Sequence, residues 1–463
     1  MRDKHTAMLY QWEGRPKFRV AYPVALQHLL AMFVSNLTPI IVIANAAEAT
    51  PAQTALMIQC AMFVAGIATL LNNYPIKIGR FQIGAGMPIV MGTASTFIAP
   101  GVGVAAAAVA SGHYNPIGLV IGGLMIASVA ELVVGLFYKY IKRFFPPMVI
   151  GCVLVAIGLM LIPIGINNFA GGAPATNPEF GSIQNLALGF TVFLIGLMLQ
   201  RFAKGLWKVS AILIAITVGY VIAMIMGILD LSGIRDVGWI SVPIPWSLRP
   251  VFEWGAISSF LVIYFISGLS TIGYTSTIAM NGLGRPAKSK EISGAIVCDA
   301  VSSTFAAVFN CLPSTEFGQN AGMVAMTKII NRWCFALCAF TLIIAGLFPK
   351  IGVIFTNIPP AVLGGAILTV FAMILNNGIQ MIALEGFSPR NLTVLGVTFG
   401  IGLGFGGNAA AFVGLTEIPW LGWLAFLMND RIAFVAVIAI LTNLLFPRNE
   451  EEKQKLKAAQ GEE

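Results

Sequence analysis

Residues 316–328 read Glu316-Phe317-Gly318-Gln319-Asn320-Ala321-Gly322-Met323-Val324-Ala325-Met326-Thr327-Lys328, inside a chain otherwise apolar enough to fill a bilayer. The run carries a carboxylate, two carboxamides, two glycines and a threonine. Nothing in hydrocarbon satisfies such polar groups, so a neighbouring helix or a polar solute must meet them. We therefore interpret the run as the floor of a solute-binding site at membrane depth.

The composition places the whole chain in a membrane. Of its 463 residues, 57% are hydrophobic and only 10% are charged, and the mean hydropathy is +0.86. A soluble domain carries roughly 25% charged residues. Several soluble domains are therefore excluded, and the sequence predicts an all-α polytopic membrane protein.

The positive net charge of +8 does not indicate a nucleic-acid partner, because Lys and Arg lie in short loops and at the termini. No cleavable signal is expected, since the first apolar run is longer than a signal core. The cysteines all fall in apolar stretches, where small core residues are expected rather than metal ligands. They are Cys60, Cys152, Cys298, Cys311, Cys334 and Cys338.

About fourteen apolar windows have the length of a membrane-spanning helix. A second half-helix is expected around Trp420–Trp423, inside the thirteenth window. The windows are 20–46, 52–73, 82–111, 115–138, 145–169, 182–200, 207–229, 255–281, 291–311, 312–328, 329–348, 353–381, 391–427 and 431–447.

The basic residues support this count. With the N-terminus in the cytoplasm, 23 of the 27 Lys and Arg residues fall on the cytoplasmic side. Basic residues are enriched in cytoplasmic loops. The sequence therefore predicts an even number of spans in the plasma membrane, with both termini cytoplasmic.

Weak internal similarity indicates two repeats. Residues 145–151 resemble 358–364 at an offset of 213, and 185–197 resemble 391–403 at an offset of 206. Each offset corresponds to seven spans, an odd number, so the second copy must be inverted. Inverted repeats are typical of secondary transporters, whose solute site lies at mid-membrane between the copies.

Spans 3 and 10 are poor continuous helices, because each carries Pro and Gly near its start, in 84–92 and 312–318. We expect a short extended piece followed by a half-helix in each. Non-helical backbone at this depth survives only where it is buried in protein or lines a cavity.

The carboxamides of Gln319 and Asn320 can each donate and accept hydrogen bonds, which suits a planar heterocycle with imide and carbonyl edges. Bonding between helices is the alternative. A strand alternation would put Gln319 and Phe317 on one side and Glu316 and Asn320 on the other. One amide would then brace the scaffold while the other meets the solute.

Three acids and one histidine are predicted at membrane depth, and an anion there must be paired, protonated or functional. Glu131 precedes the basic cluster Lys139, Lys142 and Arg143, which favours a structural role. Asp299 is followed by hydroxyl residues and has Lys328 as a possible partner, so coupling and structure both stay open. His28 is expected to bond a neighbouring helix or to take part in coupling. The third acid is Glu316.

The pattern Gln319-Asn320-x-Gly322-x-x-x-x-Thr327-Lys328 resembles the signature of the nucleobase/ascorbate transporter family. Further similarity lies in Gln27-His28, Gly86-Met87-Pro88, 144–147 and Asp299. The resemblance covers nearly the whole chain. It implies fourteen spans in two inverted repeats, and Gln319 is similar to the residue of purine-type members, whereas uracil-type members tend to carry Glu.

The resemblance also implies two domains and a homodimer formed through the gate. The core domain would comprise 1–144 (spans 1–4) and 254–348 (spans 8–11). The gate domain would comprise 145–253 (spans 5–7) and 349–463 (spans 12–14 and a cytoplasmic tail).

Span 8 departs from the family pattern Glu-x-Ile-Gly-Asp, because this chain has Ser270-Thr271-Ile272-Gly273-Tyr274. The first acid of that pattern usually binds the base and is tied to proton coupling. Ser270 can still hydrogen-bond a ring edge but cannot titrate. Our hypothesis is that Glu316 or Asp299 supplies the negative charge instead.

The sequence thus predicts an alternating-access transporter for a purine-type base, xanthine-like or urate-like, with proton symport. The expected partners are the base, a proton or other cation, the bilayer and a second copy, with no cofactor, metal or nucleic acid. The expected substrate-binding residues are Gln319, Asn320, Ser270, Phe317, Tyr274, Gly318 and Thr93, and the expected coupling residues are Asp299, Glu316 and His28.

Two alternatives stay open. The same fold could carry uracil or another small planar or anionic solute, possibly without coupling. An ion channel is the rival from a different class. An enzyme is not expected, because the chain has no His-rich cluster, no Ser/His dyad and no catalytic carboxylate pair.

Overall fold

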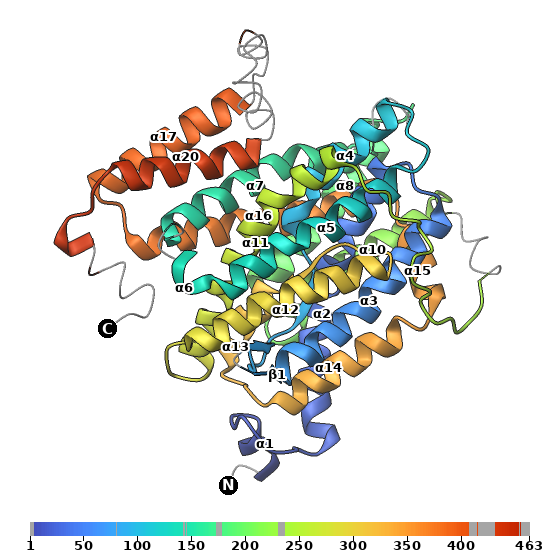
Figure 1. Ribbon diagram of the computed structural model, residues 1–463. Helices are drawn as coiled ribbons and strands as arrows, with labels where there is room; N and C mark the ends of the chain where they lie inside the picture. Colours follow the sequence, from blue (N-terminus) through green and yellow to red (C-terminus); the bar gives the residue numbers. More distant parts are fainter. Residues whose placement is uncertain are drawn as a thin grey trace.

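The computed structural model describes residues 4–79, 81–141, 144, 146–172, 178–229, 237–406, 414, 431–452 and 454. Within this part the chain is mostly helical, and long helices pack side by side (Figure 1). The predicted half-helix around Trp420–Trp423 lies outside the described residues.

The first part of the chain contains two long helices, a break and two further helices. The break holds a short hairpin near the end of the molecule where α1 lies, a buried strand and one 3-10 turn, Ser95–Phe97. The elements are α1 (Lys4–Met8), α2 (Phe18–Ala46), α3 (Pro51–Asn73), β1 (Ile76–Ile78), β2 (Phe81–Ile83), β3 (Met91–Thr93), α4 (Ile98–Ala110) and α5 (Pro116–Leu136).

The rest of the chain again contains long helices, with short helices and a short strand between them. Proline occupies the first turn of α5, α7 and α16, where its missing N–H has no intrahelical partner. The elements are α6 (Tyr138–Ile141), α7 (Pro147–Phe169), α8 (Ile183–Phe202), α9 (Leu206–Val209), α10 (Ala211–Ile225), α11 (Trp254–Gly282), α12 (Ser289–Val308), β4 (Ser314–Glu316), α13 (Gly318–Thr327), α14 (Arg332–Ala345), α15 (Pro349–Thr356), α16 (Pro360–Glu385), α17 (Pro389–Gly406) and α20 (Arg431–Leu445).

Eight helices in the described part are long and apolar enough to cross a membrane. The pair α14 and α15, bent by 80° at its break, is a candidate ninth span. Three shorter apolar helices cover Ser95–Ala110, Ala211–Ile225 and Phe434–Leu445. A multi-pass helical membrane protein is thus confirmed.

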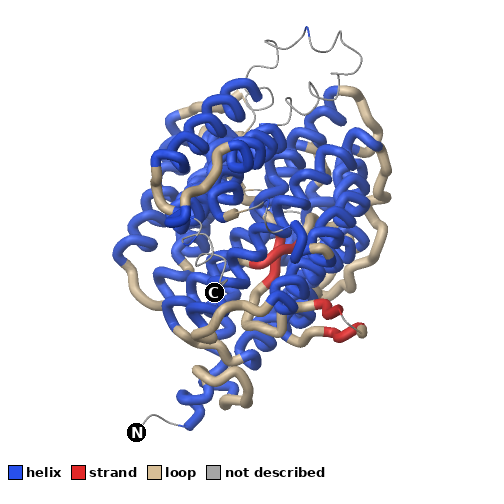
Figure 2. The backbone as a smooth tube through the Cα atoms, turned by 60° about the vertical axis from the view of Figure 1, so that its left-hand side comes forward, coloured by secondary structure: helices blue, strands red, loops and turns tan. Residues whose placement is uncertain are grey.

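Two extended pieces meet in the middle of the helical bundle (Figure 2). β3 pairs antiparallel with β4, with Met91 opposite Glu316 and Thr93 opposite Ser314. The 3-10 turn and α4 follow β3, and α13 follows β4. The predicted breaks, each an extended piece followed by a half-helix, are confirmed.

The helices pack in two groups. In one, α3 lies against α14, and α5 lies against α11 and α12. In the other, α7 runs along α16, α8 lies against α16 and α10, and α17 pairs with α20 (Figure 1). Glycine permits the close approach of α7 and α16, because a Cβ on Gly151 would lie 2.7 Å from the carbonyl oxygen of Gly378.

The apolar core extends through both groups, with buried Ile, Val, Leu, Phe and Ala side chains from most of the long helices. All six cysteines are buried and free, which confirms their prediction as small core residues. A buried thiol behaves as a small hydrophobic group.

Candidate functional site

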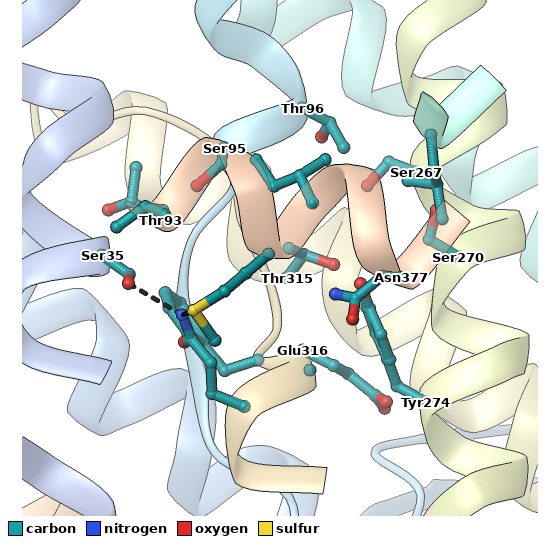
Figure 3. Close-up of a pocket in the computed structure, with 17 residues that line it drawn as sticks. Ser35, Thr93, Ser95, Thr96, Ser267, Ser270, Tyr274, Thr315, Glu316 and Asn377 are labelled. Carbon is teal, nitrogen blue, oxygen red and sulfur yellow. Dashed lines mark hydrogen bonds between the residues drawn. The ribbon is translucent and has the colours of Figure 1, made fainter. Parts of the chain in front are cut away.

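Two adjoining cavities, of about 80 Å³ and about 520 Å³, lie between the two helix groups. The smaller one is bounded by the paired breaks on one side and by α16 on the other (Figure 3). Seven residues line both cavities: Leu154, Ser270, Tyr274, Gly318, Gln319, Met373 and Asn377.

Gln319 lies in the first turn of α13 and lines both cavities. Its Nε2 donates to Ser35 Oγ of α2 at 3.0 Å. Its Oε1 is buried and accepts no hydrogen bond from any described residue. A buried acceptor without a partner is costly, so this oxygen is available to a donor on a bound solute.

Asn320, the next residue, turns away from the cavities. Its Nδ2 donates to the backbone oxygen of His28 at 3.1 Å and lies 3.0 Å from His28 Nδ1. The His28 ring packs against Phe335 at a centroid distance of 4.5 Å. Neither His28 nor Asn320 is among the residues that line the two cavities, so this pair joins α13 to α2.

The expected bracing of the scaffold by one amide is therefore observed for Asn320, whereas contact of Gln319 with a solute stays a prediction. The expected strand alternation is wrong. α13 begins at Gly318, so Gln319 and Asn320 are helical. Neighbouring side chains on a helix diverge by about 100° rather than pointing to opposite faces. The extended piece ends at Glu316 because its pairing with β3 ends there.

Tyr274 of α11 provides the aromatic wall of the site and lines both cavities. A Cβ on Gly318 would lie only 2.7 Å from Tyr274 Cε1, so glycine is what allows the phenol ring to lie against the break. Phe317 also borders the smaller cavity, but its ring packs against Gly92 within the apolar core. Of the two aromatic residues expected in the site, Tyr274 is the better placed, because it lines both cavities.

Ser270 and Thr93 lie on opposite sides of the smaller cavity (Figure 3). Ser270 Oγ makes only a long contact of 3.4 Å to the Ile266 carbonyl of its own helix. The backbone N–H of Thr93 donates to Asn36 Oδ1 at 2.7 Å, which fixes the end of β3. Both hydroxyl groups belong to the polar lining.

Glu316 in the lining and Asp299 behind it are both held by threonines. Thr275 Oγ1 donates to Glu316 at 2.9 Å, and Thr315 Oγ1 donates to Asp299 Oδ2 at 3.0 Å. Thr271 also donates to Asp299 Oδ2. Glu316 borders the smaller cavity, whereas Asp299 reaches it only through Thr315.

The expectation that Lys328 pairs with Asp299 is wrong. Lys328 adopts a left-handed conformation at the end of α13, with φ of 59°, and its Nζ donates to the Asn281 carbonyl at 2.7 Å. Glu131 is fully buried, and neither of its oxygens makes a hydrogen bond within the described part of the chain. Two of its expected basic neighbours, Lys142 and Arg143, lie outside the described residues.

Several lining residues were missed by the sequence reasoning. Asn377 of α16 carries the clearest overlooked signal, since it is half of an Asn376-Asn377 pair in an apolar helix. The hydroxyl residues have no distinguishing spacing, because they come from separate helices. The missed polar residues of the smaller cavity are Ser35, Ser95, Thr96, Ser267, Thr315 and Asn377.

The larger cavity leads away from the breaks, past Gln380 and Leu384 of α16, to Gln200 and Lys208. Lys208 belongs to the basic residues that the sequence assigns to the cytoplasmic side. The site is therefore connected to that end of the molecule.

Solved membrane transporters share the fold. The transmembrane domain of a cyanobacterial bicarbonate transporter, BicA, superposes with a TM-score of 0.58 at 16% identity, covering 93% of this chain and 98% of BicA. The murine anion transporter Slc26a9 in its inward-facing state gives 0.61 at 13% identity, covering 95% of this chain and 70% of Slc26a9.

Similar sequences cover the whole length of the chain. Xanthine permease XanP of Escherichia coli (strain K12) is 30% identical over 451 residues, which is 96% of each chain. Xanthine permease XanQ of the same strain is 31% identical, covering 95% of this chain and 94% of XanQ. Uric acid permease PucJ of Bacillus subtilis (strain 168) is 29% identical, covering 95% of each.

Residues 20–407 match the family Xan_ur_permease, described as Permease family. The match includes the Gln319-Asn320 signature and both breaks, and it confirms the resemblance to the nucleobase/ascorbate transporters. This chain belongs to that permease family.

Proposed function

We propose that the protein transports a purine-type nucleobase of the xanthine or uric acid kind by alternating access. The observation that carries the proposal is the buried, unpartnered Oε1 of Gln319 at the wall shared by both cavities. The relatives named above, a xanthine permease and a uric acid permease among them, support this class of substrate.

The lining offers what a flat, polar ring needs. Gln319 Oε1 can accept from a ring N–H, while Asn377 and the hydroxyl of Ser270 can serve its carbonyl edge. The Tyr274 ring provides an aromatic face for stacking. A few convergent polar groups in an otherwise apolar wall are typical of small-molecule sites.

The proposed architecture has fourteen spans in two inverted seven-span repeats. The pairing of helices supports it, because the main contacts between helices of one repeat have counterparts at the equivalent positions of the other repeat. α5 packs on α11 and α12 as α14 packs on α2 and α3, and α8 with α10 corresponds to α17 with α20. Two further pairs consist of equivalent elements, one from each repeat. They are β3 with β4 and α7 with α16.

The proposed core domain comprises 1–144 and 254–348, and the proposed gate domain comprises 145–253 and 349–463. The cavities lie where these parts meet, with Gln319 on the first and Asn377 on the second. Movement of one part past the other would close one route and open another, which is alternating access. The connection to Lys208 supports an inward-open arrangement, with both termini cytoplasmic in the plasma membrane.

Proton symport is the proposed energy source, with Asp299 and Glu316 as the acids nearest the lining. The resemblance to the family supports a homodimer formed through the gate domain. The hypothesis for the acids is tested with Glu316→Gln and Asp299→Asn. It fails if both variants keep the pH dependence of uptake seen in the native protein.

The substrate is tested by uptake of radiolabelled xanthine, urate, guanine, uracil and ascorbate in a transport-null cell, with and without a protonophore. We expect saturable uptake of xanthine or urate that the protonophore abolishes. Uptake of uracil alone would favour the pyrimidine alternative, and a non-saturable ion current would favour a channel. Uptake of none of these compounds would overturn the proposed substrate class.

A further inference from the structure

Glu131 is a buried acid that the proposed transport cycle does not yet use. It lies in the middle of α5 with a relative exposure of 0%. Within the described part of the chain, neither carboxyl oxygen makes a hydrogen bond and no ion pair involves Glu131. An isolated anion in such a place is unstable, so the carboxyl must hold a proton or share one.

A second acid faces Glu131 from the neighbouring helix. α5 packs against α11 and α12, and two contacts with α12 bracket the acids. Ser128 Oγ lies 2.7 Å from Thr304 Oγ1, and Ser293 Oγ donates to the Gly135 carbonyl at 2.7 Å. Glu131 lies between the two contacts on α5, as Asp299 does on α12. Asp299 is also fully buried, and its Oδ1 has no hydrogen-bond partner among the described residues. The Tyr264 hydroxyl, buried on α11, is likewise without a partner there.

One hydroxyl side chain lies between each acid and the solute cavity. Ser267 lines the smaller cavity and precedes Gly268, where a Cβ would lie 3.4 Å from Glu131 Cγ. Thr315 donates to Asp299 Oδ2 and lines the same cavity. Figure 3 shows both hydroxyl side chains at the cavity wall.

The ionisable groups around this place are all acidic or neutral. Within the described part of the chain these groups are Glu131, Asp299, Glu316, Tyr264 and Cys298, all of them buried. Two carboxyls without a cation cannot both be ionised at short range, so one proton between them is the stable state. Glu131 lines neither cavity, which favours a proton over a metal ion with its several ligands.

We propose that Glu131 and Asp299 share one transported proton, exchanged with the cavity through the hydroxyls of Ser267 and Thr315. The inference deepens the proposed function and depends on it for the substrate. Linkage makes the coupling reciprocal, because a base that binds the protein more tightly when the pair is protonated also raises the affinity of the pair for the proton. Glu131 and Asp299 are then positioning residues for the proton and do not touch the base.

The test uses purified full-length protein in lipid vesicles. A gradient of about one pH unit is worth about 1.4 kcal/mol per proton, which corresponds to about tenfold accumulation of xanthine at equilibrium. We expect Glu131→Gln to retain xanthine exchange between the two sides while its accumulation falls from about tenfold to about onefold. Glu131→Asp keeps an acid and is expected to restore accumulation.

Ser128→Ala is the matched control, since Ser128 lies one turn before Glu131 on α5 and bonds Thr304 Oγ1 at 2.7 Å without a carboxyl. It is expected to accumulate xanthine like the native protein. Accumulation by Glu131→Gln at the native level would overturn the proposal. So would joint loss of exchange and accumulation in both Glu131 variants, because that result indicates a structural role.

Infrared spectroscopy tests the shared proton without any substrate. A protonated-carboxyl band is expected in the native protein, absent in Glu131→Gln and shifted in Asp299→Asn. A band unchanged in Glu131→Gln overturns the shared proton whatever the substrate is. Failure of the native protein to exchange xanthine, with the band behaving as expected, overturns only the proposed substrate.

Discussion

Asn320 Nδ2 lies 3.0 Å from His28 Nδ1 and donates to the backbone oxygen of the same histidine at 3.1 Å. The contact joins the half-helix α13 to α2 across a separation of 292 residues. Both side chains are buried, with exposures of 1% and 2%. The neighbouring Gln319 faces the cavities, so its direction depends on how firmly Asn320 anchors the helix.

Substitution of this anchor is expected to affect stability and substrate affinity differently. Asn320→Ala leaves the buried His28 Nδ1 without its side-chain partner, which costs about 1–3 kcal/mol of folding stability. His28→Ala removes the same Nδ1 contact and keeps only the bond to the backbone oxygen, so the double variant should cost less than the sum of the two. Thermal unfolding in detergent measures both effects, and strictly additive losses would contradict the anchor.

Gln319 is expected to act on affinity instead. Gln319→Ala removes an acceptor from the solute site, worth about 1 kcal/mol or a little more, so the affinity for xanthine should fall about five- to tenfold. Ser35→Ala serves as the matched control, because it removes only the partner of Nε2. Equilibrium binding of labelled xanthine to the purified protein measures both, and an equal loss in the two variants would count against Oε1 as the contact.

Local chemistry was enough to predict the breaks and the polar run of the site. Proline and glycine near residues 88 and 313 disfavour helix on their own, and polar side chains at membrane depth require partners nearby. These signals predicted Gln319, whereas Ser270 and Tyr274 were predicted from the resemblance to the family pattern in span 8. All three line one cavity.

The remainder of the lining required the tertiary structure. Ser35 and Asn377 stand more than 300 residues apart in sequence, and only the packing of the two helix groups brings them to the same cavity. The direction of Asn320 depended on where β4 ends and α13 begins, which the pairing with β3 determines. The lack of a hydrogen-bond partner for Glu131 among the described residues depends on how α5 packs against α11 and α12.

Gly318 is expected to be essential for transport because of its contact with Tyr274. A Cβ at this position would lie 2.7 Å from Cε1 and 3.0 Å from Cζ of the phenol ring, so the ring must move. Gly318→Ala should therefore reduce xanthine uptake by more than about tenfold while the protein still folds, as alanine favours a helix by about 1 kcal/mol. Uptake rates normalised to membrane expression measure the effect.

Gly396→Ala is the matched control for that substitution. Gly396 lies within α17, and a Cβ there would meet no atom within 4 Å. Its uptake should match that of the native protein. Native uptake in Gly318→Ala would show that Tyr274 can move without loss of function.

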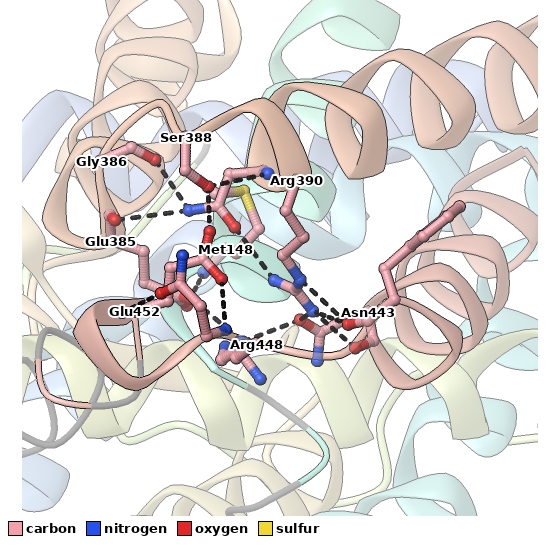
Figure 4. A network of polar contacts seen from close by, with 11 residues as sticks. Met148, Glu385, Gly386, Ser388, Arg390, Asn443, Arg448 and Glu452 are labelled. Atoms are coloured by element: carbon pink, nitrogen blue, oxygen red, sulfur yellow. Dashed lines mark hydrogen bonds and ion pairs between the residues drawn. The ribbon is translucent and has the colours of Figure 1, made fainter.

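A buried ion pair joins the end of α16 to the segment after α20 (Figure 4). Arg448 Nη2 lies 3.0 Å from Glu385 Oε2, and the other oxygen of Glu385 accepts from the backbone N–H of Met148 at the start of α7 at 2.8 Å. The side-chain exposures are 14% for Arg448 and 3% for Glu385. The pair therefore connects α7, α16 and the segment after α20 at one point of the proposed gate domain.

Removal of the arginine is expected to destabilise this domain strongly. Arg448→Ala leaves the carboxylate of Glu385 buried without its cation, which costs about 3–5 kcal/mol. Arg285→Ala is the control, because its pair with Glu291 is more exposed, at 37% and 15%, and is worth at most about 1 kcal/mol. The midpoint of thermal unfolding in detergent should fall much further in Arg448→Ala than in Arg285→Ala. Equal shifts in the two variants would mean that Glu385 finds another partner or becomes protonated when Arg448 is lost.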